Sequence, residues 1–119
     1  MSTRELLPDE WEHFFDCFSR RFRGRRMTLN VAAPRADGER LLADRLPLVG
    51  ITAEPRSRSP EAIEVMLGDT HVQNVVHVVR QPTHVRVAQV SSGEDDQLII
   101  EAASGERARV DFEADVNRW

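Results

Sequence analysis

The spacing of the hydrophobic residues changes at Gly24, and this change divides the chain into two kinds of structure. Before Gly24, large apolar residues recur at the three- and four-residue intervals of an α-helix. After it, apolar residues such as Met27 and Leu29 alternate with polar ones, as they do in β-strands. A chain with this pattern is expected to fold as one helix followed by a sheet.

The segment at about 9–23 is predicted to be an amphipathic helix. Its large apolar residues fall within an arc of about 100° on a helical projection; they are Leu7, Trp11, Phe14, Phe15, Phe18 and Phe22. Asp9 and Glu12 have the spacing of a capping box, Pro8 suits a helix entrance, and Gly24 suits a helix exit. Because five of the seven aromatic residues lie here, the helix is predicted to supply the bulky half of the core.

The remainder, about 25–113, is predicted to form an antiparallel meander of six to seven strands, because no helix-length segment separates the later strands for parallel crossovers. The predicted strands cover 27–33, 46–54, 62–68, 72–79, 84–90, 97–103 and 106–112, with polar loops at 55–60, 80–83 and 91–96. Segment 39–45 fits either one short helical turn or an extended edge. In the last strand, Ala108, Val110 and Phe112 are predicted to face inward.

These elements together predict an α+β domain spanning 1–119, in which the helix packs on one face of a twisted, half-barrelled sheet. A chain of 119 residues with 40% hydrophobic and 30% charged residues suits one compact domain. A short C-terminal tail ending in Trp119 follows the last strand.

The cysteine count and the N-terminus indicate a cytoplasmic protein. Cys17 is the lone cysteine, so no internal disulfide can form, which favours a reducing compartment. The start has no apolar signal segment, and no apolar run approaches the roughly 18 residues of a membrane span. We therefore expect no membrane contact.

Three motifs resemble those of a family of small bacterial proteins known only as a domain of unknown function. Its Trp-x-x-Phe-Phe-x-x-Phe-Ser helix matches Trp11 through Ser19, its Leu-Pro-Leu-x-Gly-Ile strand matches 46–51, and its His-x-Ile-x-x-Pro segment matches His77 to Pro82, with valine for the isoleucine. The resemblance spans nearly the whole chain. It implies a bacterial origin and an uncharacterised function, with no catalytic residues to carry over. After Gly24 the chain departs from the family, which commonly has tryptophan there.

Catalytic, metal and cofactor sites are not predicted. His71, His77 and His84 with a carboxylate such as Glu64 could bind zinc, but no His-x-x-x-His or His-x-His spacing is present. Cys17 is expected on the partly buried flank of the helix, without the features of an activated nucleophile. The acidic residues 94–96 lack the spacing of a calcium loop. We therefore expect no enzymatic activity and no cofactor.

Five arginines lie close together around Gly24, and they raise the question of nucleic-acid binding; they are Arg20, Arg21, Arg23, Arg25 and Arg26. Arginines in a last helical turn also complement the helix dipole, and the three in the helix point to different sides. The net charge of −4 opposes polyanion binding outside a local patch. Arg25 and Arg26 are both predicted to be exposed.

Two functions from different classes follow from these observations. The favoured one is a non-catalytic domain that binds another protein, a second copy or a small ligand through its polar sheet face or an edge strand. The alternative is a nucleic-acid or ribonucleoprotein accessory factor that uses the basic edge from Arg20 to Arg26. His77 and His84 are added to the candidate binding surface.

Overall fold

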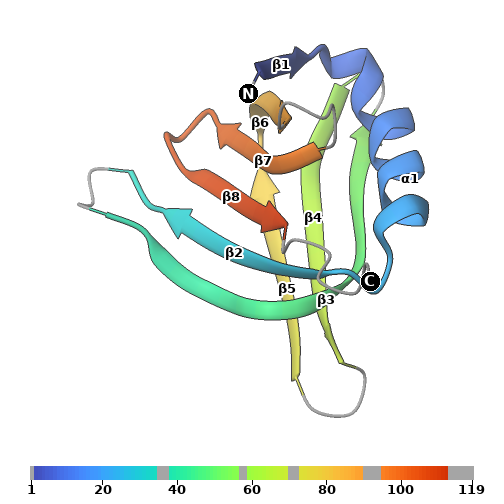
Figure 1. Cartoon of the computed structure of the whole chain (residues 1–119). Coiled ribbons are helices and arrows are strands. Elements are labelled where there is room, and N and C mark those ends of the chain that lie inside the picture. Colours follow the sequence, from blue (N-terminus) through green and yellow to red (C-terminus); the bar gives the residue numbers. More distant parts are fainter. Residues whose placement is uncertain (1, 35–37, 57–58, 70–72, 90–94, 113–119) are drawn as a thin grey trace.

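The computed structural model describes residues 2–34, 38–56, 59–69, 73–89 and 95–112. In chain order the elements are β1 (Ser2–Leu6), a 3₁₀ turn (Pro8–Glu10), α1 (Trp11–Phe22), β2 (Arg26–Ala32), β3 (Arg40–Arg56), β4 (Ser59–Asp69), β5 (Gln73–Arg80), β6 (Pro82–Gln89), β7 (Asp95–Ala102) and β8 (Arg107–Phe112). The strands form one antiparallel sheet in the order β1-β6-β7-β8-β2-β3-β4-β5, and α1 packs against it (Figure 1). The predicted α+β class is confirmed.

The described sheet has eight strands rather than six to seven, because β1 was not predicted. Its sequence is short and mostly polar, so it lacks the alternation that marks a strand. Pairing with β6 holds it in place, from Ser2 opposite Gln89 to Leu6 opposite Val85. The indole Nε1 of Trp11 also donates to the carbonyl of Leu6 at 3.1 Å, which ties the end of β1 to the helix.

Strand β3 is one strand across the two segments 39–45 and 46–54 that were predicted separately, so the extended alternative for the first segment is confirmed. Residues up to Pro47 pair with β2, and residues from Leu48 pair with β4. Arg45 has a positive φ of 53°, near the register shifts in the β2–β3 pairing. The single strand therefore changes partner near its middle.

Three predicted loops are shorter in the structure. Pro55 and Pro60 pair with each other at the end of the β3–β4 hairpin, and Asp95 and Asp96 belong to β7. Gln81 alone separates β5 from β6, with a positive φ of 51°. Consecutive strands β5 and β6 do not pair, so the chain turns a corner there and the sheet curls around its core (Figure 1).

The helix begins differently from the prediction. Glu10, and not the predicted capping box of Asp9 and Glu12, closes its start: a Glu10 carboxylate oxygen accepts from the Leu7 backbone N–H at 2.7 Å. Leu7 precedes the 3₁₀ turn and is 61% exposed, so it does not belong to the apolar stripe. The exit at Gly24, with a φ of 86°, is confirmed.

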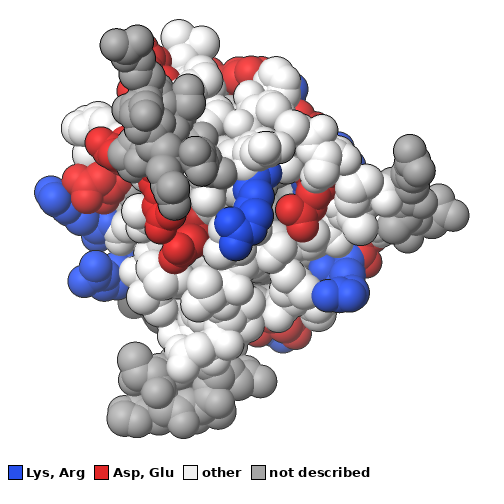
Figure 2. All heavy atoms as spheres, turned by 180° about the vertical axis from the view of Figure 1, so that it is seen from behind, with Lys and Arg blue, Asp and Glu red and all other residues white. Residues whose placement is uncertain are grey.

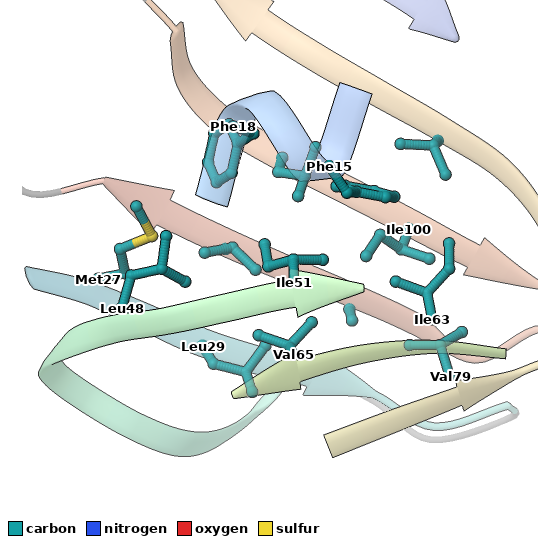
Figure 3. Packing of buried hydrophobic residues seen from close by; sticks show 14 of the residues in the cluster. Phe15, Phe18, Met27, Leu29, Leu48, Ile51, Ile63, Val65, Val79 and Ile100 are labelled. Carbon is teal, nitrogen blue, oxygen red and sulfur yellow. The ribbon is translucent and has the colours of Figure 1, made fainter. Parts of the chain in front are cut away.

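The aromatic stripe forms the core with the inward side chains of the sheet (Figure 3). Trp11, Phe15, Phe18 and Phe22 are buried, while Phe14 is half-buried. From the sheet, the predicted inward residues Ala108, Val110 and Phe112 are buried as well. The ring of Phe112 lies 5.2 Å from that of Phe18 and 5.6 Å from that of Phe22, which joins the last described strand to the helix.

Ser19 attaches the helix to the part of β3 that no longer pairs with β2. The Ser19 hydroxyl accepts from the Ile51 N–H at 2.8 Å and donates to the Ile51 carbonyl at 3.0 Å. Next along the strand, the Leu48 carbonyl accepts from the Gly24 N–H at 2.9 Å. Side-chain and main-chain groups of the helical segment thus take the place of a neighbouring strand along this part of β3.

No helix in the described part of the chain combines the length and apolar character that crossing a bilayer requires. The predicted C-terminal tail, with Trp119, lies outside the described residues.

Replacing Phe15 by alanine is expected to lower the free energy of unfolding by about 3–5 kcal/mol, because a fully buried ring leaves a cavity. Phe18→Ala should behave in the same way. Phe14→Ala is the matched control, and its half-buried ring should cost less. Urea denaturation measures all three, and a near-neutral Phe15→Ala would contradict the packing.

Ser19→Ala is expected to cost about 1–3 kcal/mol, because it leaves both main-chain groups of Ile51 without their partner at a partly buried position. Ser104→Ala is the control: its hydroxyl accepts one exposed bond, from the Glu106 N–H at 3.2 Å. That change should stay within about 0.5 kcal/mol. Equal effects in urea denaturation would mean that Ser19 does not anchor the helix.

Candidate functional site

The arginines around Gly24 do not act as one group. Arg21 and Arg25 both lie against the ring of Phe22, with guanidinium-to-centroid distances of 5.0 and 5.3 Å. Arg26 donates to the Arg45 carbonyl at 2.8 Å, and so holds the irregular part of β3. Arg26 is exposed as predicted, whereas Arg25 is half-buried against the aromatic ring instead of exposed.

Arg20 and Arg23 instead line a groove between the polar side of α1 and β3, which we call the α1–β3 groove. It has a volume of about 960 Å³, and its charged lining also includes Glu12 and Glu54. An ion pair of 3.1 Å already joins Arg20 to Asp16 within it. The groove therefore carries charges of both signs, partly neutralised by each other. The back of the molecule likewise shows scattered blue and red groups rather than a continuous basic field (Figure 2).

The two histidines of the candidate surface do not come together. His77 lies on β5, with its Nε2 atom 3.4 Å from a carboxylate oxygen of Glu106. That nitrogen is buried and makes no hydrogen bond within the described structure. His84 lies on β6, where its Nδ1 is 2.8 Å from Glu5. Each histidine has its own carboxylate neighbour.

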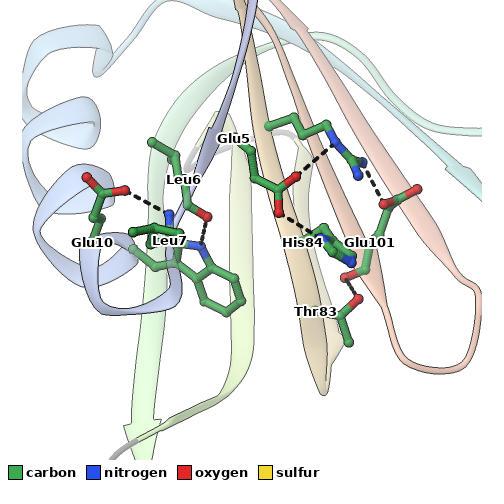
Figure 4. Close-up of polar contacts among 9 residues, drawn as sticks. Glu5, Leu6, Leu7, Glu10, Thr83, His84 and Glu101 are labelled. Carbon is green, nitrogen blue, oxygen red and sulfur yellow. Dashed lines mark hydrogen bonds and ion pairs between the residues drawn. The ribbon is translucent and has the colours of Figure 1, made fainter.

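A polar network surrounds His84 on the surface formed by β1, β6 and β7 (Figure 4). Glu5 also contacts Arg86 at 3.4 Å, and Arg86 donates to Glu101 at 2.6 Å. The hydrogen bond with His84 is the main cause that lowers the pKa of Glu5 below its ordinary value. Cross-strand pairing of opposite charges accounts for the network.

Groups that could hold a metal ion do not gather in the part of the chain that the structure describes. His71 lies outside that part. Glu64, the predicted carboxylate ligand, faces Glu54 on the neighbouring strand, and their hydrogen bond raises the pKa of Glu64. Cys17 is exposed rather than partly buried, with its sulfur 3.6 Å from Nε2 of His13.

The edge of β5 is a feature that the sequence did not reveal. Residues of antiparallel strands point their main-chain N–H and C=O groups alternately to the two neighbours. Since those of Ile51 point to Ser19, those of Thr52 point to Glu64 on β4. The alternation then directs the main-chain groups of Val65 toward His77 on β5.

The main-chain groups of the even-numbered residues of β5 therefore point away from β4; these residues are Asn74, Val76, Val78 and Arg80. β5 is the last strand of the sheet, and no hydrogen bond joins these groups to any residue that the structure describes. Val76 is 59% exposed. We call this row of main-chain groups, with its side chains, the β5 edge.

The valine run at 72–79 was the available signal for this edge, because it has apolar residues of both odd and even number. A strand buried on both faces shows the same composition. Only the strand order distinguishes an edge strand from a strand buried on both faces, and this order places β5 at the end of the sheet.

Opposite pH effects are expected for Glu5→Gln and Glu64→Gln. Because the pKa of Glu5 is lowered in the folded protein, its ionised carboxylate stabilises the fold at neutral pH. This contribution is lost as the pH falls through the folded pKa. Glu64 has a raised pKa, so its protonated form contributes stability that is lost as the pH rises through that pKa. At pH 7, Glu5→Gln should destabilise and Glu64→Gln should stabilise. Both differences from the wild type should shrink toward acid pH in urea denaturation; shifts of one sign would contradict the assignment.

A family model described as a family of unknown function (DUF5335) matches residues 2–118. No curated protein matches the chain, and no solved structure matches it. The family match covers the helix, all the described strands and both histidines of the candidate surface. The chain therefore belongs to the DUF5335 family of unknown function.

Proposed function

We propose that this chain is a non-catalytic protein-interaction domain that binds an extended segment of a partner along the β5 edge. The observation that carries the proposal is the row of outward main-chain groups on Asn74, Val76, Val78 and Arg80, which has no partner within the described structure. An added strand would satisfy these groups, and main-chain hydrogen bonds supply the affinity in this mode of recognition.

The side chains of the edge support the same interpretation. Edge strands that avoid association usually carry charges, prolines or bulges. From residue 74 to residue 79, β5 has no charged residue and no proline, and its pairing with β4 has no register shift. Exposed Val76 offers an apolar contact to an incoming side chain.

The β5 edge is a better candidate than the α1–β3 groove. The groove is lined by charged groups of which Arg20 and Asp16 already bind each other. A partner in the groove would have to replace such contacts, whereas a partner at the edge would bond main-chain groups that have no partner among the described residues. The nucleic-acid alternative stays a prediction. Its arginines Arg21, Arg25 and Arg26 already contact Phe22 or the Arg45 carbonyl, and we therefore favour the edge.

Val76→Pro is a selective test, because the one main-chain donor that proline removes is the N–H of residue 76, which points away from β4. Peptides selected from a random display library on the wild type would be synthesised and titrated by calorimetry. We expect Val76→Pro to weaken their binding at least tenfold and Val76→Thr, which keeps the N–H, to retain it. Urea denaturation of both variants verifies folding. Equal binding by folded Val76→Pro, or a chain that neither selects a peptide nor self-associates, would contradict the proposal.

A further inference from the structure

We infer that the partner strand at the β5 edge is the β5 strand of a second copy of this chain, paired antiparallel about a two-fold axis at His77. This inference rests on the proposed function and names its partner. The segment Val75-Val76-His77-Val78-Val79 reads the same in both directions, with Asn74 and Arg80 at its ends. An isologous contact needs such self-complementarity, because the same surface must serve both copies.

The hydrogen-bond alternation of β5 fits this register. An axis at His77 places Val76 opposite Val78 of the second copy, and Asn74 opposite Arg80 of the second copy. All of these residues have main-chain groups that point to the free side. Each such pair exchanges two hydrogen bonds, so the strand pairing makes about eight. Registers displaced by one residue would set outward groups opposite groups already bonded to β4.

The side chains also suit two copies. Val76, 59% exposed in one chain, packs beside Val78 of the second copy on the outer face of the joined sheet. Arg80 is the one charged residue of β5. Antiparallel pairing separates the two Arg80 residues by about 20 Å along the strands, so like charges do not oppose each other.

The opposite edge of the sheet lacks these properties. β1 has five residues, and its central Arg4 and the following Glu5 are charged and exposed. Such charges are a common protection of edge strands against pairing. Self-association is therefore expected at β5 and not at β1. A contact between two strands alone is smaller than a standard protein–protein interface, so we expect the dimer to dissociate reversibly.

Analytical ultracentrifugation of the wild-type chain from about 1 to about 100 μM, where weak interfaces dissociate, is the first test. We expect a reversible monomer–dimer equilibrium, with Val76→Thr dimerising like the wild type. Val76→Pro should be monomeric throughout, since it loses the N–H at residue 76 from each copy.

Cysteine cross-linking tests the register in a Cys17→Ser background, which removes the exposed native thiol. An axis at His77 brings the two residue-77 Cα atoms to about 4.5 Å, within disulfide range. His77→Cys should form a disulfide-linked dimer on mild oxidation, while Val76→Cys and Val78→Cys should form little. Cross-linking of Val76→Cys in preference to His77→Cys would overturn this register.

A monomeric wild type at every concentration, or a Val76→Pro variant that dimerises like the wild type, would overturn the self-association. If that monomer still bound the selected peptides in a manner that Val76→Pro abolishes, the proposed function would stand without the second copy. Loss of both results would remove the two proposals together.

Discussion

The hydrogen bonds between Ser19 and Ile51 connect the position of the helix with the character of the far edge of the sheet. They point the main-chain groups of Ile51 to α1 and therefore away from β4. Because main-chain groups in antiparallel strands point alternately to the two neighbours, this direction also determines those in β4 and β5. The main-chain groups of Val76 and Val78 therefore point outward. A slip of one residue between β3 and β4 would exchange inward and outward side chains throughout this half of the sheet.

The helix can take this position because β3 is long and changes its partner. β2 pairs with β3 only as far as Pro47, so beyond that residue the side of β3 opposite β4 has no neighbouring strand in the described sheet. The rings of Phe15 and Phe18 are buried in the core, and the Ser19 hydroxyl donates to the Ile51 carbonyl on this side of β3. One amphipathic helix thus fills the core and also covers an edge that would otherwise lack a partner.

The local periodicities were readable from the sequence because neighbouring residues decide them. The helix, its exit at Gly24 and the inward face of β8 all follow from spacing alone. The predicted capping box was wrong, because Glu10 accepts from the Leu7 N–H and so closes the start two residues earlier. β1 was missed because long-range pairing with β6 determines it. Strand order lies beyond such reasoning: β5 and β6 are separated by Gln81 alone, yet they do not pair. The β5 edge depends on that order. The valine run at 72–79 therefore predicted a strand but not its position at the end of the sheet.

The difference between the two edges of the sheet determines whether self-association would stop at a dimer or continue into a fibre. An edge strand that pairs with different surfaces can continue into a fibre, whereas a two-fold contact uses the same surface of both copies and closes. In the described sheet, the β5 edge has no charged residue from 74 to 79, and the charged β1 edge disfavours a second contact. Pairing centred on His77 would therefore consume the open edge of both copies and stop at a dimer. Dimer formation would therefore cover the valine-rich β5 edge and prevent further aggregation through it.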